Sequence, residues 1–124
     1  GRGRVFYALK DFDQSFQSFV KCVELRPNDF EANFYAGYLV IEKANAQVEA
    51  LNANTSLSYD QYNEEYAKIN TVYAEAIPWL ERAYEINPND RGTIEFLNNL
   101  CFRLREMDGI AEKYNKYHEL FMNL

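Results

Sequence analysis

One phrase is written twice in this chain, and that duplication constrains the fold more than any other feature. The first copy runs from Phe19 to Asp29 and the second from Leu80 to Asp90. Each copy carries apolar residues at three- and four-residue spacing, which predicts an amphipathic helix, and each ends in Pro-Asn-Asp, which stops one helix and opens the next. Repetition at a fixed offset predicts a helical repeat protein, an architecture that displays a surface and need not carry chemistry.

Length and composition favour one helical domain. The 124 residues suffice for one compact domain or about three stacked helical repeats. An apolar content of 48%, with 10 Tyr and 9 Phe, excludes a disordered tail, because so much aromatic surface would be buried in any available core. Five Gly and three Pro are too few for the regularly spaced turns of a strand-rich sandwich.

The charge balance bounds the class of partner. A net charge of −6 and a pI near 4.8 argue against nucleic acid or an anionic membrane, since both are bound by clustered Lys and Arg. The simpler interpretation of this charge is solubility alone. The sequence has no apolar run long enough to span a bilayer, and residues 1–4 are basic without the apolar segment of a signal peptide. We expect a soluble protein, cytoplasmic or periplasmic, and the sequence does not choose between these compartments.

Two cysteines, Cys22 and Cys101, lie in apolar helical phrases. Neither has the Cys-x-x-Cys spacing or the His neighbour of a metal or redox site. We expect both to be small buried hydrophobes and, because a whole repeat separates them, not to form a disulfide within one chain.

The two copies share a small–large–small pattern that lets helices approach closely. The three residues lie twelve, eight and five positions before the proline in each copy: Ser15, Phe19 and Cys22 before Pro27, and Ala76, Leu80 and Ala83 before Pro88. This pattern resembles the second helix of a tetratricopeptide repeat. Residues 30–37 are similar to the first helix of that family, with Ala36-Gly37 at its Leu-Gly position.

The resemblance implies an all-α fold, a right-handed α-α superhelix of about two and a half repeats. Residues 1–29 would form a partial first repeat, 30–90 the second, and 91–124 the third with a C-terminal cap. Residues 1–11 would hold only the tail of a first helix, so the chain resembles the C-terminal fragment of a bacterial-type tetratricopeptide repeat protein. Tyr117, where the family prefers Ala, predicts a last helix with nothing packed behind it.

The middle repeat is longer than the family frame. The two prolines are 61 positions apart, whereas the repeat needs 34, which leaves 27 residues around positions 43–72. Apolar residues at heptad-like spacing on both sides of 52–57 predict an elongated antiparallel helical hairpin, with Ser58 and Gln61 forming a capping box at its tip. The alternative is a mobile loop in which only the Tyr-rich half is helical. Pro78 predicts a kink near 74–78 or, alternatively, the first turn of a new helix.

Residue types that carry chemistry are scarce. His118 is the only histidine, and we expect it at the surface without an oriented catalytic partner. The sequence has no phosphate-binding glycine loop, no Ser/His/Asp set and no metal-ligand spacing. We therefore predict that the chain is not an enzyme, with no catalytic residue, no metal and no cofactor.

The resemblance also implies where a partner would bind. Family members contact ligands from positions of their first helices that here are Glu31, Phe34, Tyr35, Tyr38, Ile41, Glu42, Gly92, Glu95, Phe96, Asn99, Phe102 and Arg103. Only Asn99 and Arg103 suit a clamp for a terminal carboxylate, so we do not expect one. We predict instead an aromatic groove for a peptide with apolar anchors, formed by Phe34, Tyr35, Tyr38, Glu42, Asn99, Phe102 and Arg103. The alternative is that several of these aromatic residues are core.

The sequence supports three hypotheses about function, two of which involve this groove. The first is a protein–protein interaction scaffold that binds a peptide or protein segment. The second is an accessory C-terminal domain of a larger enzyme or transport receptor, with the groove filled by its own polypeptide. The third is a homo-oligomer, formed through the hairpin or through an N-terminal edge with Val5, Phe6 and Leu9.

Overall fold

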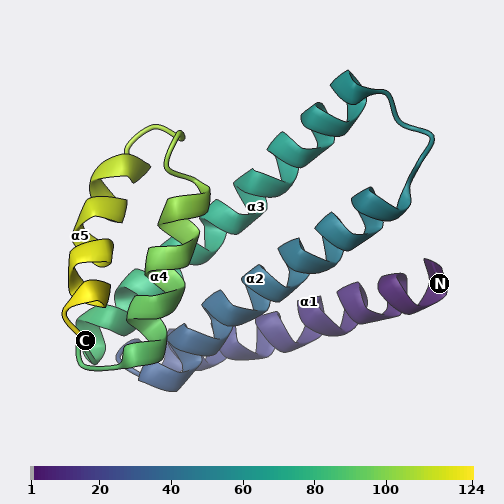
Figure 1. Ribbon diagram of the computed structural model, residues 1–124. Helices are drawn as coiled ribbons and strands as arrows, with labels where there is room; N and C mark the ends of the chain where they lie inside the picture. The colour runs from purple at the N-terminus through teal and green to yellow at the C-terminus, as the bar shows by residue number, and fades with distance from the viewer. Residues whose placement is uncertain (1) are drawn as a thin grey trace.

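The structure is a computed structural model that describes residues 2–124, with side chains from residue 11 onward. The described chain is built from five helices and contains no strand (Figure 1). The helices are α1 (Arg2–Leu25), α2 (Phe30–Ala53), α3 (Tyr59–Ile86), α4 (Arg91–Arg103) and α5 (Ile110–Met122). The prediction of an all-α fold is confirmed.

The starts of α2, α3 and α4 are set by side chains that cap free backbone N–H groups. Asp29 accepts a hydrogen bond from the backbone N–H of Ala32 at 3.2 Å, and Asp90 accepts one from Thr93 at 2.9 Å. The repeated Pro-Asn-Asp therefore places the same cap before α2 and before α4. The predicted capping box of Ser58 is confirmed as well, since its Oγ accepts from the backbone of Gln61 and its N–H donates to the Gln61 side chain.

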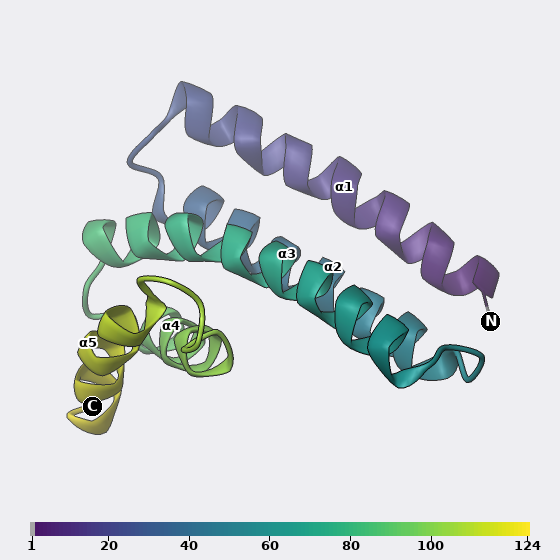
Figure 2. The ribbon, with the colours of Figure 1, turned by 90° about the horizontal axis from the view of Figure 1, so that it is seen from above.

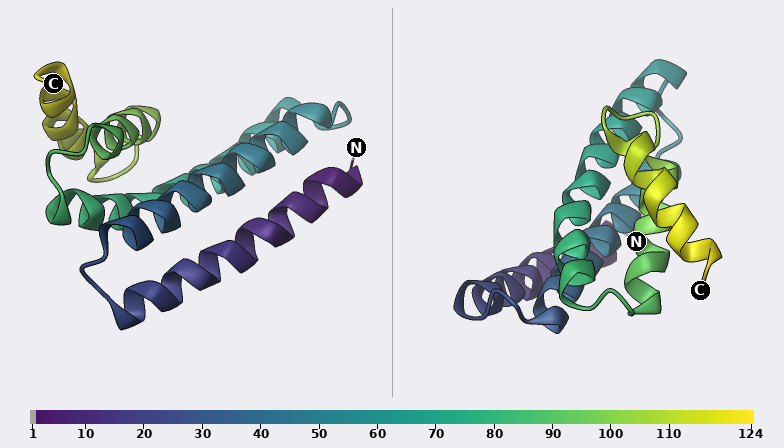
Figure 3. Two further views of the ribbon diagram at one scale, coloured as in Figure 1. Left: turned by 90° about the horizontal axis from the view of Figure 1, so that it is seen from below. Right: turned by 90° about the vertical axis from the view of Figure 1, so that its left-hand side faces the viewer.

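The helices α2 and α3 form a long antiparallel pair that carries the rest of the fold. Figure 2 shows α1 on one side of this pair and α4 with α5 on the other, and Figure 3 shows the same order from below. Because α2 is helical as far as Ala53, the mobile-loop alternative is wrong. The two helices are joined near the tip by the Tyr62 hydroxyl, which donates to Asn52 at 2.7 Å. The assignment of 43–72 to an insertion, like the division into repeats, stays a prediction.

A tight helix crossing holds this pair together at its base. A Cβ atom built on Gly37 of α2 would lie 2.8 Å from Cγ of Leu80 and 3.3 Å from the carbonyl oxygen of Ala76. Ala76, Leu80 and Ala83 are all fully buried. The small–large–small pattern of α3 therefore interlocks with α2 as predicted, and only a residue without a side chain fits at Gly37.

The same pattern on α1 has a different environment. Ser15 and Cys22 are exposed and Phe19 is half-buried, because α1 packs on α2 through another face, which includes the buried Val23. The expectation that Cys22 is buried is wrong, whereas Cys101 is buried as predicted.

Two further expectations about helix boundaries are corrected. Helix α1 is continuous from Arg2 to Leu25, so residues 2–11 do not form a separate helix tail. Helix α3 runs through Pro78, so the alternative of a new helix beginning there is wrong. The side chains of Val5, Phe6 and Leu9 lie outside the described residues, and so does the N-terminal edge that they were expected to form.

The last helix is fixed to α3 by a buried tyrosine. Tyr117 is only 1% exposed, its ring meets that of Tyr84 edge-on at 5.8 Å, and its hydroxyl donates to Glu81 at 2.7 Å. Lys113 also donates to Glu81, at 2.6 Å. The expectation that nothing packs behind this position is wrong, because α5 faces α3 there and Glu81 provides the hydrogen-bond acceptor that a buried hydroxyl needs.

Candidate functional site

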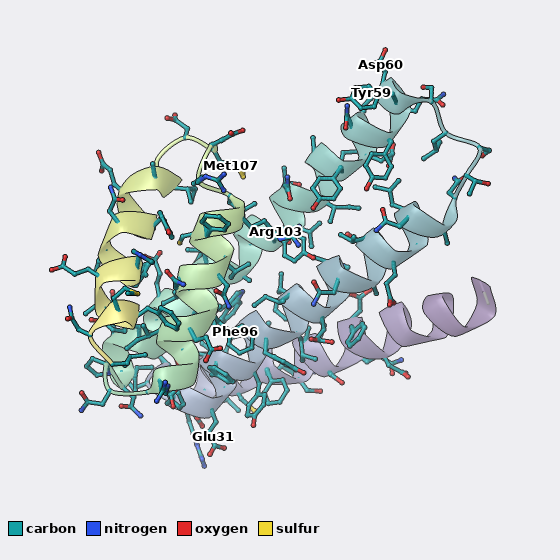
Figure 4. The ribbon with its side chains drawn as sticks, viewed as in Figure 1. Glu31, Tyr59, Asp60, Phe96, Arg103 and Met107 are labelled. Atoms are coloured by element: carbon teal, nitrogen blue, oxygen red, sulfur yellow. The ribbon has the colours of Figure 1, made fainter. Side chains whose placement is uncertain are left out.

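Aromatic side chains from three helices form one continuous network on the fold, which we call the aromatic ladder. Its members are Phe19 of α1, Phe30, Phe34, Tyr35 and Tyr38 of α2, and Phe96 of α4. Ring centroids are 5.6 Å apart for Phe19–Tyr35, 5.4 Å for Phe34–Tyr35, 6.4 Å for Tyr35–Tyr38, 5.8 Å for Phe34–Phe96 and 5.9 Å for Tyr38–Phe96. Figure 4 shows Phe96 on α4 close to α2, where the two helices approach.

The ladder is half core and half surface. Phe34 and Phe96 pack against the buried core cluster, while Tyr35 is 43% exposed. Most of the ring pairs are edge-on, an arrangement that favours contact between the positive edge of one ring and the negative face of another. The rings that contact the core therefore hold Tyr35 in a fixed position at the surface.

Arg103 ties α4 to the hairpin. Its guanidinium donates to the hydroxyl of Tyr66 at 2.6 Å and lies over the ring of Tyr73 at 4.4 Å (Figure 4). Burial raises the pKa of Tyr73, and the nearby positive charge of Arg103 opposes this shift. Since both partners belong to α3, the arginine expected to meet a ligand is held by the protein itself.

The remaining predicted site residues are dispersed. Phe102 is 50% exposed and turns toward α5, where its ring is 5.6 Å from that of Tyr114. Asn99 is exposed, and Glu42 is half-buried on α2, one turn beyond Tyr38. The structure therefore brings Phe34, Tyr35 and Tyr38 together and places Phe102 in a different cluster.

The sequence reasoning missed Phe19 as a member of the ladder. The duplicated phrase could have indicated Phe19, because Phe19 is the large residue of the small–large–small pattern in the first copy, as Leu80 is in the second. Leu80 is covered by α2 at the tight crossing, whereas Phe19 meets the face of Tyr35 from α1.

His118 has a partner, though not one that makes a catalytic pair. Its Nδ1 lies 3.2 Å from Oδ1 of Asn98, and its ring is 5.1 Å from that of Tyr114. Within the described part of the chain, no group of three or more His, Cys, Asp or Glu residues could hold a metal ion. No described helix is both long enough and apolar enough to cross a membrane.

Among known protein families, one matches the N-terminal part of the chain. The family model described as "Tetratricopeptide repeat" matches residues 1–29. No curated protein is significantly similar to the chain. Residues 1–29 are thus similar to a tetratricopeptide repeat, and the described chain has an all-helical fold that is consistent with an α-α repeat.

Proposed function

We propose that this chain is a protein–protein interaction scaffold that binds a peptide or protein segment on the aromatic ladder. Tetratricopeptide repeats generally mediate protein–protein interactions, which supports the class of function. The observation that carries the specific proposal is Tyr35, a half-exposed ring held by Phe19, Phe34 and Tyr38 from two helices. A rigid Tyr contributes a large contact area at a small cost in conformational entropy.

The charges around the ladder favour one kind of partner. Glu31, Tyr35, Tyr38 and Glu42 follow one another at four-, three- and four-residue steps, so they lie along one stripe of α2. Glu31 is exposed at the base of this stripe, as Figure 4 shows, and Glu42 lies at its other end. A segment with apolar anchors for the rings and Lys or Arg beside them would complement this stripe.

The test is a peptide display selection followed by affinity measurement. We expect selection on the protein to enrich peptides with apolar anchors flanked by basic residues. Tyr35→Ala is expected to weaken binding of the enriched peptide about tenfold or more, as for a tyrosine at the centre of an interface.

Tyr59→Ala is the matched control, because Tyr59 is also a helical tyrosine but is 80% exposed at the tip of the hairpin (Figure 4). We expect it to leave the affinity unchanged. Equal losses in the two variants, or enrichment of peptides without apolar anchors, would contradict the proposal.

A further inference from the structure

A cavity lies on the opposite side of the α2–α3 pair from α4. It has a volume of about 370 Å³, within the usual size range of small-molecule pockets. Its floor is formed by Leu39 and Val40 of α2, and its walls include Phe12 and Phe16 of α1 and Trp79 of α3. Figure 2 shows α1 and the α2–α3 pair running alongside each other on this side. We call this cavity the α1–α3 slot.

One end of the slot is aromatic. The rings of Phe16 and Trp79 meet edge-on, with centroids 5.7 Å apart, and so close the slot between α1 and α3. Arg82, one turn after Trp79 on α3, places its guanidinium over the indole ring, 5.7 Å from the ring centroid. The indole therefore already attracts one organic cation, as electron-rich ring faces do.

The other end of the slot is acidic. Helices α1 and α3 are both antiparallel to α2, so one helical turn toward the N-terminus on either helix leads to the same end of the slot. One turn before Phe16 on α1 is Asp13, and one turn before Trp79 on α3 is Glu75. Both carboxylates line the cavity. Arg82 lies in the opposite direction from Trp79.

Among the side chains of residues 11–124, the charges at this end are not balanced. Lys43 of α2 lines the slot and forms an ion pair with Asp13, with 3.1 Å between Nζ and Oδ1. Glu75 forms no ion pair with any side chain among residues 11–124. Pro78, which also lines the slot, has no N–H to donate to the carbonyl of Ala74.

From this arrangement we infer that the α1–α3 slot binds a Lys or Arg side chain presented by a partner protein. Such a side chain is an alkyl chain that ends in an ammonium or guanidinium group. The aliphatic stem lies against Phe16, Leu39 and Trp79, and the charged end meets Glu75. A long aliphatic side chain with a terminal charge matches a slot whose apolar walls adjoin two carboxylates at one end. The net charge of −6 also attracts a basic partner over longer distances.

Trp79 makes the inference directly testable, because it is the only tryptophan in the chain. Its fluorescence would be followed while the protein is titrated with n-butylammonium or n-butylguanidinium, and in parallel with 1-butanol and butyrate as the neutral and anionic probes of similar shape. We expect a saturable change with the two cations, at concentrations about tenfold lower than any change with 1-butanol, and no change with butyrate.

Two glutamate variants of α3 separate a specific contact from general electrostatics. Glu75→Gln is expected to weaken cation binding about three- to tenfold, within the range of partly exposed charge and cation–π contacts. Glu85→Gln removes the same charge from an exposed position of α3 that does not line the slot, and we expect it to leave binding unchanged. Far-UV circular dichroism would establish that both variants are folded.

Three results would overturn the inference. Equal binding of 1-butanol and n-butylammonium would make the slot a purely apolar cavity. Equal losses in Glu75→Gln and Glu85→Gln would mean that only the overall charge matters. Absence of any saturable change with the cations would mean that the slot does not bind them.

Discussion

Gly37→Ala should destabilise the protein, because α2 and α3 cross tightly at Gly37. In Gly37→Ala the new Cβ would lie 2.8 Å from Cγ of Leu80, whereas carbon atoms in contact prefer about 3.5–4.0 Å. Leu80 is fully buried, and the third close atom, at 3.3 Å, is the backbone carbonyl oxygen of Ala76. Neither neighbour can turn away, so α2 and α3 must separate.

The magnitude follows from two opposing contributions. Alanine stabilises a helix interior by about 1 kcal/mol relative to glycine, while overpacking of a core costs about 1–3 kcal/mol. Separation of the helices also loosens the contacts of Ala76 and Ala83, which are fully buried at the same crossing. We expect Gly37→Ala to lower the free energy of unfolding by about 1–2 kcal/mol, which is roughly 4–8 °C in Tm for a chain of this size.

Gly92→Ala is the matched control. Its Cβ would meet only Oδ2 of Asp90 at 3.5 Å and Cζ of Phe34 at 4.0 Å, which are ordinary contacts. Since α4 gains helix propensity without a clash, we expect stabilisation by about 0.5 kcal/mol. Urea denaturation followed by circular dichroism at 222 nm would measure both variants. If Gly37→Ala is as stable as the parent protein, or if both variants shift in the same direction, the description of the crossing is wrong.

Three further predictions concern the C-terminal helices and the thiols. Tyr117→Phe, which removes the buried hydrogen bond to Glu81, should lower the free energy of unfolding by about 1–2 kcal/mol in urea, and an unchanged midpoint would contradict this. Burial raises the pKa of the Cys101 thiol from 9.0 to about 11. Because the folded protein holds this proton at higher pH than the unfolded chain does, the stability should be full below pH 9 and fall by about 1–2 kcal/mol as the pH rises to 11, with a smaller fall in Cys101→Ala. A thiol reagent at neutral pH should modify the exposed Cys22 at once and Cys101 only on unfolding, whereas equal rates would refute the assigned burial.

The sequence predicts well the features that depend on local chemistry. The caps at Asp29, Ser58 and Asp90 follow from side chains that bond the backbone three residues ahead, and such bonds depend only on residues next to the helix start. The crossing of Gly37 with Leu80 could also be anticipated, because a small residue opposite a large one admits close helix approach.

Features that depend on what lies opposite a residue could not be predicted in this way. Cys22 and Ala83 occupy the same position of the duplicated phrase, yet Cys22 is exposed and Ala83 is buried. The reason is that α2 covers this face of the second copy, whereas the corresponding face of the first copy is not covered in the described chain. Tyr117 was expected to lie uncovered, but its hydroxyl has an acceptor from a residue 36 positions earlier. The arrangement of the candidate site residues could be predicted only in part for the same reason. Phe34, Tyr35 and Tyr38 share one helix, while the direction of Phe102 depends on how α5 folds back.

Helix α1 packs extensively along one neighbour, as α5 does, so it can open before the central helices do. Among the extensive helix pairings of the described chain, α2 has two partners and α1 has α2 alone, with Phe16 against Trp79 as its side-chain contact to α3. Release of α1 therefore uncovers less apolar surface than the loss of any central helix. In native-state hydrogen exchange its amides should report a sub-global opening, well below the free energy of complete unfolding. The same release would expose the α1–α3 slot to bulk water, so its ligand would hold α1 closed and slow exchange in that helix.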